Sequence, residues 1–388
     1  MSHLDPSHPS TPEWTRRGLL KTGLAAAAGT VIAPSALAWA PRPDRLTRHV
    51  ILIAFAGGVR TRETLGMPAN VPNLTAMAKE GVAYYRTKTA NLGHFGATMS
   101  LFTGISEARG IRENARGGDP TIFEYLRKDL ELPATDVWIS TSGGAQQTNY
   151  SHGLHPDYGS QYGANVLDGD GIFNSEFKSI LDSWGRPKEM DKRELELMHR
   201  MRSGIGGAAE DSRASASRET VERYILEELT RGTSDVRGAN AADAKAMRVA
   251  RNLLSIFKPK LVSVVLQRAD SAHDSYNEYS EIIRMNDAAL GELWDVVKSD
   301  PVLAETTSIF VLPEFGRDQD LNSRRGLDHG DGSDDLNYVS TVCWGPDFKR
   351  GHESNETVRT IDVCSTICEM FDVRARFARG KRLPRLFA

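Results

Sequence analysis

The stretch HVILIAFA at residues 49–56, followed by Gly57-Gly58, decides the fold of this chain. Its apolar residues run without alternation, which is typical of a strand buried on both faces of a parallel sheet. A second run of this kind, LVSVVLQ, covers residues 261–267. Two buried strands so far apart in the sequence predict a parallel sheet whose crossover connections contain helices.

Further strands and helices alternate around these two runs. The sequence predicts strands at residues 82–88, 136–141, 307–312 and 338–344. It predicts helices at residues 73–80, 97–102, 121–128, 240–257, 276–298 and 361–371. This alternation indicates an α/β fold, with a mostly parallel sheet and helices on both faces.

Residues 142–238 interrupt the alternation. Residues 142–171 are rich in Gly, Asn, Ser and Tyr, and residues 203–217 are rich in Gly, Ala and Ser. Such composition favours loops over regular elements. We therefore expect one α/β domain over residues 39–388, in which 142–238 form an insertion that caps the carboxyl edge of the sheet.

Composition excludes several classes of protein. The 388 residues carry 48 Lys and Arg against 51 Asp and Glu, so the net charge of −3 gives no electrostatic basis for binding nucleic acid. A hydrophobic content of 40% is that of a globular chain. The three cysteines, Cys343, Cys364 and Cys368, are too few for a disulfide scaffold.

The N-terminus resembles an export signal. Arg16-Arg17 precede an Ala/Gly-rich apolar stretch, as in twin-arginine signals, and Ala36-Leu37-Ala38 fits a cleavage site. We expect a signal peptide over residues 1–38, the twin-arginine translocon as a partner, and a periplasmic or extracellular location. The alternative is an uncleaved amphipathic helix. The sequence has no run of about 18 apolar residues, so we expect no stable membrane span.

The ordered landmarks of the chain resemble those of the alkaline phosphatase and sulfatase superfamily. They are Gly57-Gly58 after the first strand, Val71-Pro72-Asn73-Leu74, Ser100-Leu101-Phe102-Thr103-Gly104, Asp270 and His273, Glu314-Phe315-Gly316-Arg317, and Asp328-His329-Gly330. Within the superfamily they are most similar to a group of twin-arginine-exported, sulfatase-like proteins of uncharacterised function. The resemblance covers residue 49 to the C-terminus, except for the insertion.

The resemblance implies a hydrolase that acts on small anionic phosphate or sulfate esters with divalent metals: zinc, calcium, magnesium or manganese. It assigns a first metal site to Asp270, His273 and His329, with Asp328 beside them and Asp274 as an alternative ligand. The other interpretations are that Asp270 caps the following helix and that His329 is a surface-loop histidine.

The second metal site of the superfamily is degenerate in this sequence. The superfamily aspartate after the first strand falls on Ala56 or on Arg60, and neither side chain can bind a metal. The superfamily Asp-His pair after the late strand is Glu314-Phe315, of which Glu314 alone can coordinate. The resemblance therefore leaves open a centre with a single ion.

The superfamily nucleophile falls on Gly93 or His94, so no hydroxyl or thiol stands there. We expect His94 to ligate a metal, to form a phosphohistidine or to bond the loop backbone. Arg60 and Arg317 are candidate anion binders, because a guanidinium matches phosphate and sulfate oxygens, whereas Arg62 is expected at the surface.

Two functions are consistent with these residues. The first is a metal-dependent hydrolase of phosphate or sulfate esters. The second is a non-catalytic periplasmic binding or assembly protein on the same fold, which the missing aspartate and nucleophile favour. Metal content and ester turnover distinguish them.

Overall fold

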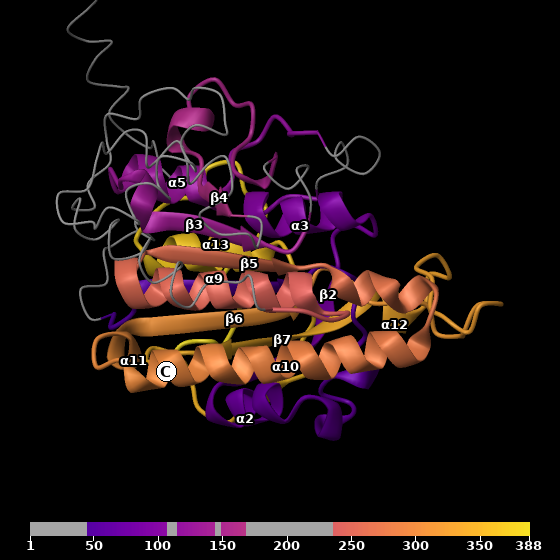
Figure 1. Ribbon diagram of the computed structural model, residues 1–388. Helices are drawn as coiled ribbons and strands as arrows, with labels where there is room; N and C mark the ends of the chain where they lie inside the picture. Colours follow the sequence, from indigo (N-terminus) through magenta and orange to yellow (C-terminus); the bar gives the residue numbers. More distant parts are fainter. Residues whose placement is uncertain (1–44, 107–114, 144–148, 168–235) are drawn as a thin grey trace, which may run out of the picture. The chain divides into compact units, whose positions relative to one another are not determined.

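The computed structural model of the protein describes residues 45–106, 115–143, 149–167 and 236–388 (Figure 1). They belong to one compact unit that spans Asp44–Ala388. The predicted signal peptide at residues 1–38 lies outside the described residues, as does most of the predicted insertion.

The described residues contain one nine-stranded sheet, in the order β4-β3-β5-β1-β6-β7-β2-β8, with β9 paired to β2. β1 is parallel to β5 and β6, and β7 is antiparallel to β6 and β2. The predicted mostly parallel sheet is therefore confirmed. The strands are β1 (His49–Phe55), β2 (Val82–Lys88), β3 (Val137–Thr141), β4 (Asn165–Leu167), β5 (Leu261–Leu266), β6 (Thr307–Pro313), β7 (Tyr338–Trp344), β8 (His352–Ser354) and β9 (Val358–Arg359).

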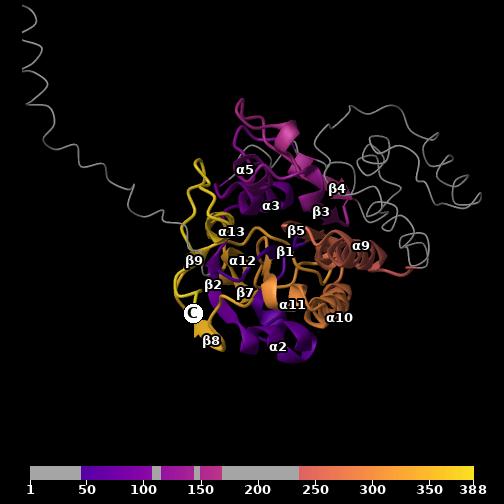
Figure 2. The same ribbon diagram turned by 90° about the vertical axis from the view of Figure 1, so that its left-hand side faces the viewer.

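Helices cover both faces of the sheet (Figure 2). On one face lie α2 (Pro72–Glu80), α9 (Ala241–Phe257) and α10 (Tyr276–Ser299). On the other lie α3 (His94–Thr103), α5 (Ile122–Asp129) and α13 (Asp362–Met370). The short helices α11 (Leu303–Thr306) and α12 (Asp334–Asn337) flank β6 and β7. Alternate residues of β1 enter the two cores, so the strand is apolar throughout.

Two elements differ from the sequence prediction, and the first of them belongs to the site. α3 begins at His94 rather than at Ala97, so His94 is a helical residue that follows the Gly93 cap. Residues 165–167, inside the predicted insertion, form the edge strand β4, which pairs in parallel with β3. A three-residue strand at a sheet edge leaves too short a pattern to be recognised in the sequence.

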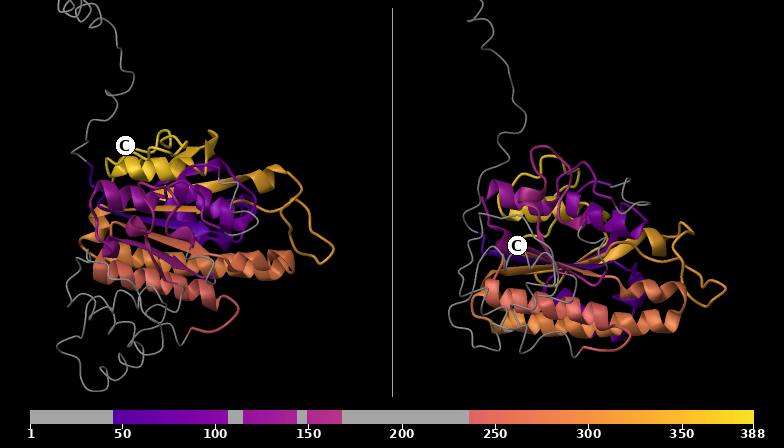
Figure 3. Two further views of the ribbon diagram at one scale, coloured as in Figure 1. Left: turned by 90° about the horizontal axis from the view of Figure 1, so that it is seen from above. Right: turned by 45° about the horizontal axis from the view of Figure 1, so that its top comes forward.

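The carboxyl ends of the central strands meet at one edge of the sheet. Phe55 of β1 is in register with Leu266 of β5 and Pro313 of β6. The turn after β1, the 3-10 helix η7 (Arg268–His273) and the loop between β6 and α12 therefore start side by side (Figures 1 and 3). In open α/β sheets this edge forms the binding site.

None of the helices in the described part of the chain combines the length and apolar character that a membrane span needs.

Candidate metal centre

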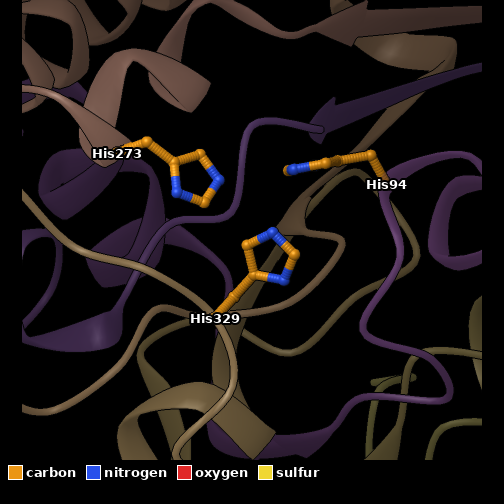
Figure 4. Close-up of side chains that lie close together, drawn as sticks. All are labelled: His94, His273 and His329. Atoms are coloured by element: carbon orange, nitrogen blue, oxygen red, sulfur yellow. The ribbon is translucent and has the colours of Figure 1, made fainter.

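Three histidines converge at the carboxyl edge of the sheet (Figure 4). They are His94 at the start of α3, His273 at the end of η7, and His329 in the loop before α12. One ligand atom of each lies within 4.8 Å of the others. The sheet topology brings together residues that are up to 235 positions apart in the chain, between His94 and His329.

Two carboxylates hold His94. Its Nδ1 lies 2.6 Å from Oε1 of Glu314, and its Nε2 lies 3.0 Å from Oδ1 of Asp270. Burial lowers the pKa of His94, but the carboxylates outweigh burial and raise that pKa to about 10. Glu314 is fully buried, and its other oxygen accepts a hydrogen bond of 2.6 Å from the Thr98 hydroxyl. Burial raises the pKa of Glu314 to about 7.

A carboxylate also stands behind His273. Its Nδ1 lies 2.7 Å from Oδ1 of Asp328, and this hydrogen bond lowers the pKa of Asp328. Since a neutral imidazole has one N–H, this contact leaves Nε2 of His273 as an acceptor. Nε2 accepts from Nη1 of Arg317 at 3.0 Å.

His329 completes the cluster, and no carboxylate among the described residues forms a hydrogen bond or ion pair with it. Its ring centroid lies 5.1 Å from those of His94, His273 and Phe315. Burial, followed by the positive charge of Arg317, lowers its pKa to about 4. The imidazole of His329 is therefore neutral at pH 7 and offers a lone pair.

Asp270 lies beside His94, His273 and Arg317. Its Oδ1 accepts a hydrogen bond of 2.6 Å from Arg317 and lies 3.4 Å from Nε2 of His273. Burial raises the pKa of Asp270, but His94 and Arg317 outweigh burial and lower it, so the carboxylate is ionised.

Of the predicted metal ligands, the structure thus brings Asp270, His273 and His329 together and adds His94. Glu314 and Asp328 lie one layer behind, each against a histidine nitrogen.

These residues fit a divalent metal in donor chemistry once the ion displaces a proton from His94, whose raised pKa otherwise leaves it without a lone pair. Imidazole nitrogen with carboxylate oxygen is a zinc donor set, whereas calcium and magnesium take oxygen ligands. Two ligands of one tetrahedral zinc lie about 3.4 Å apart. The ligand atoms of the three histidines lie within 4.8 Å of one another, which is wider than this spacing.

Arg60 lies in a separate ion pair. Its guanidinium donates to both carboxylate oxygens of Glu63, at 2.7 and 2.5 Å, and to the carbonyls of Asp318 and Gln319. Only 3% of Arg60 is exposed. The expected anion-binding role does not match this placement, because the guanidinium N–H groups that would bind an anion already donate to Glu63. Arg62 pairs with Asp335 at the surface.

The partners of Glu314 and Asp270 leave no signal in the sequence. Thr98 follows His94 by four residues, so both lie on one face of α3 and reach the same carboxylate. A helix that starts at His94 would have placed these two residues on one face, but not against Glu314. Arg317 was expected to bind an anion, and instead it contacts Asp270 and His273.

The chain matches no protein-family model and no curated protein. Its structure is similar to crystal structures of known proteins. The wild-type alkaline phosphatase PafA has a TM-score of 0.57 at 9% identity, over 90% of this chain and all of PafA. A protein of the alkaline phosphatase superfamily from Vibrio parahaemolyticus has a TM-score of 0.51 at 15% identity, over 89% of this chain and 71% of that one.

A putative sulfatase from Bacteroides thetaiotaomicron has a TM-score of 0.50 at 10% identity, over 88% of this chain and 76% of that one. Identities this low establish the fold and leave the activity to be argued from the site. The described chain has the alkaline phosphatase-like α/β fold.

Proposed function

We propose that this protein is an exported hydrolase of phosphate or sulfate esters that uses a single divalent ion held by His94, His273 and His329. The observation that carries the proposal is the convergence of these imidazoles within 4.8 Å at the carboxyl edge of the sheet. Asp270 lies next to two of them and is a further candidate ligand.

The donor set supports zinc over calcium, magnesium and manganese. Three of the four candidate ligands are imidazoles, which suit zinc better than they suit harder cations. Glu314 and Asp328 lie behind the rings of His94 and His273. Carboxylates in that position orient histidine ligands and increase their basicity.

A bound ion would polarise an ester oxygen and lower the pKa of a water molecule. The protein itself supplies ionised Asp270 and the His94–Glu314 pair around that position. The start of α3 offers glycine and histidine where the superfamily has a nucleophile, and the Thr98 hydroxyl is bonded to Glu314. We therefore propose that water, rather than a side-chain hydroxyl, attacks the ester.

Zinc content and turnover test this proposal. Protein purified from its native host and loaded with zinc should hold about one ion per chain by elemental analysis. His329→Ala should lose it, while His352→Ala, a histidine of the edge strand β8, should keep it. The wild type should hydrolyse at least one member of a panel of phosphate and sulfate monoesters and diesters, and His329→Ala should not.

A non-catalytic binding or assembly protein is the second candidate. The observation that favours it is the absence of a free hydroxyl where α3 starts, since the hydroxyl of Thr98 already donates to Glu314. A folded wild type that retains no zinc after loading and hydrolyses none of these esters would establish this candidate instead.

We also propose that Arg16-Arg17 direct the chain to the twin-arginine translocon. The paired arginines before an apolar stretch support this, because the translocon recognises them. The combined variant Arg16→Lys with Arg17→Lys should accumulate in the cytoplasm on cell fractionation. Unchanged export of that variant would contradict the proposal.

A further inference from the structure

Arg317 is among the largest fully buried side chains of the described residues, with 0% of its surface exposed. It follows Glu314 by three residues, in the loop after β6. An arginine keeps its charge at every pH that a protein tolerates, so a positive charge is permanently fixed beneath the histidine cluster.

All five N–H donors of this guanidinium have acceptors inside the protein. Nε donates to the carbonyls of Gly57 and Gly58, at 3.2 and 3.3 Å. Nη1 donates to the Leu327 carbonyl at 3.2 Å and to Nε2 of His273 at 3.0 Å. Nη2 donates to the Gly57 carbonyl and, at 2.6 Å, to Oδ1 of Asp270. Since a guanidinium has five donors, none is left for a substrate oxygen. Arg317 therefore acts on the centre through other residues.

The Gly57-Gly58 turn is shaped around this side chain. Gly58 has a φ of +68°, and a Cβ there would lie 2.8 Å from Nε of Arg317. A Cβ on Gly57 would lie 2.4 Å from the backbone nitrogen of Asp270. Both glycines are needed because any side chain would displace the guanidinium or the residue that it binds.

The acceptors around Arg317 are those of a metal site: a carboxylate oxygen, an imidazole nitrogen and carbonyl oxygens. The guanidinium also lies between the turn after β1 and the loop after β6. These are the two segments to which the superfamily resemblance assigns the second ion, and here they supply neither the expected aspartate nor a histidine.

We propose that the Arg317 guanidinium is a fixed internal cation that takes the place of a second metal ion, so that the centre holds at most one. It engages Asp270 and His273, and it repels any cation placed beside it. The inference rests on the proposed metal centre and explains why that centre holds no second ion.

The proposal predicts the sign of the effect of removing Arg317. The guanidinium competes with a metal for the lone pair of His273 and for the carboxylate of Asp270. Without it, zinc binding should become stronger or a second ion should bind. If Arg317 only stabilised the fold, its removal would loosen the ligands and weaken zinc binding.

Zinc titration against a competing chelator tests the inference. Wild type, Arg317→Met and Arg317→Lys are compared as folded full-length protein, since methionine removes the charge and lysine keeps it. We expect at most one zinc per chain for the wild type and for the lysine variant. The methionine variant should bind one more ion, or bind zinc at least tenfold more tightly.

Equal or weaker zinc binding by a folded methionine variant would overturn the inference, as would two ions in the wild type. Should the methionine variant not fold, anomalous scattering from zinc-soaked wild-type crystals decides. A single peak among the histidines supports the inference, and a peak between Gly57 and Asp270 contradicts it. A zinc-free wild type with a zinc-binding methionine variant would support the inference while overturning the proposed zinc-dependent hydrolase.

Discussion

The turn after β1 and the loop after β6 begin at the same edge of the sheet, and each places one arginine in the interior. Arg60 bonds the Glu63 carboxylate, three residues away, and the carbonyls of Asp318 and Gln319, none of which is a candidate metal ligand. Arg317 bonds Asp270 and His273, from a different segment of the chain. Burial therefore does not identify an arginine of the site, whereas contact with candidate metal ligands does.

The largest expected effect comes from breaking the local pair. Glu63→Ala leaves the Arg60 charge buried without its carboxylate, which should lower the free energy of unfolding by about 3–5 kcal/mol. Urea denaturation measures this loss. The combined variant Arg60→Met with Glu63→Leu should recover most of it, and both proteins should retain zinc binding. Loss of zinc by the folded double variant would show that the two regions are not separate.

Asp270→Asn is expected to affect stability less and the centre more. The asparagine oxygen still accepts a hydrogen bond from Arg317, and the side chain is 46% exposed. The free energy of unfolding should therefore fall by only about 1–3 kcal/mol. Zinc occupancy should fall, because one negative charge beside His94 and His273 is lost. Asp274→Asn, at an exposed neighbour, is the matched control. If Asp274→Asn alone released zinc, Asp274 would be the ligand instead.

A smaller effect is expected from Asp328, which contacts the candidate ligand His273 on the side away from the histidine cluster. Asp328→Asn keeps the shape but removes the charge behind Nδ1 of His273. Zinc affinity should fall by roughly 10–100-fold with little change in melting temperature. Chelator competition measures the affinity, with the exposed Asp320→Asn of the same loop as control. An affinity equal to that of the wild type would show that Asp328 does not orient His273.

The smallest expected effect concerns His152, which has no carboxylate partner in the part of the chain that the structure describes. Burial and the charge of Arg116 lower the pKa of His152 to about 4, opposite to His94. Between pH 6.5 and about 4 the unfolded chain therefore binds more protons at this residue, so stability should fall as the pH falls through that window. Melting temperatures of wild type and His152→Gln should diverge there and run parallel above pH 7. Parallel curves throughout would contradict the pKa.

The strands were predicted well because burial on both faces leaves an uninterrupted apolar run, as in β1 and β5. Edge elements such as β4, β8 and β9 were missed, since two or three residues carry no periodicity. The start of α3 was placed three residues late because Gly93 gives no side-chain cap to recognise.

Asp270, His273 and His329 were identified as possible ligands from their residue types and their positions after predicted strands. The partners of these residues were beyond the reach of the sequence. Glu314 was expected to bind a metal directly, and its two oxygens instead contact His94 and Thr98. Arg60 and Arg317 looked alike in the sequence, as guanidinium groups following glycines at a strand end.

The sequence by itself determined the α/β class, the positions of the buried strands along the chain and the edge at which chemical groups gather. Those properties depend on local hydrophobic patterns and on the rule that parallel strands place their carboxyl ends together. Only the tertiary structure decided that His94 joins the histidine cluster and that Arg317, rather than Arg60, supplies its buried positive charge. Those outcomes depend on distances between side chains that lie far apart in the chain, and packing alone sets those distances.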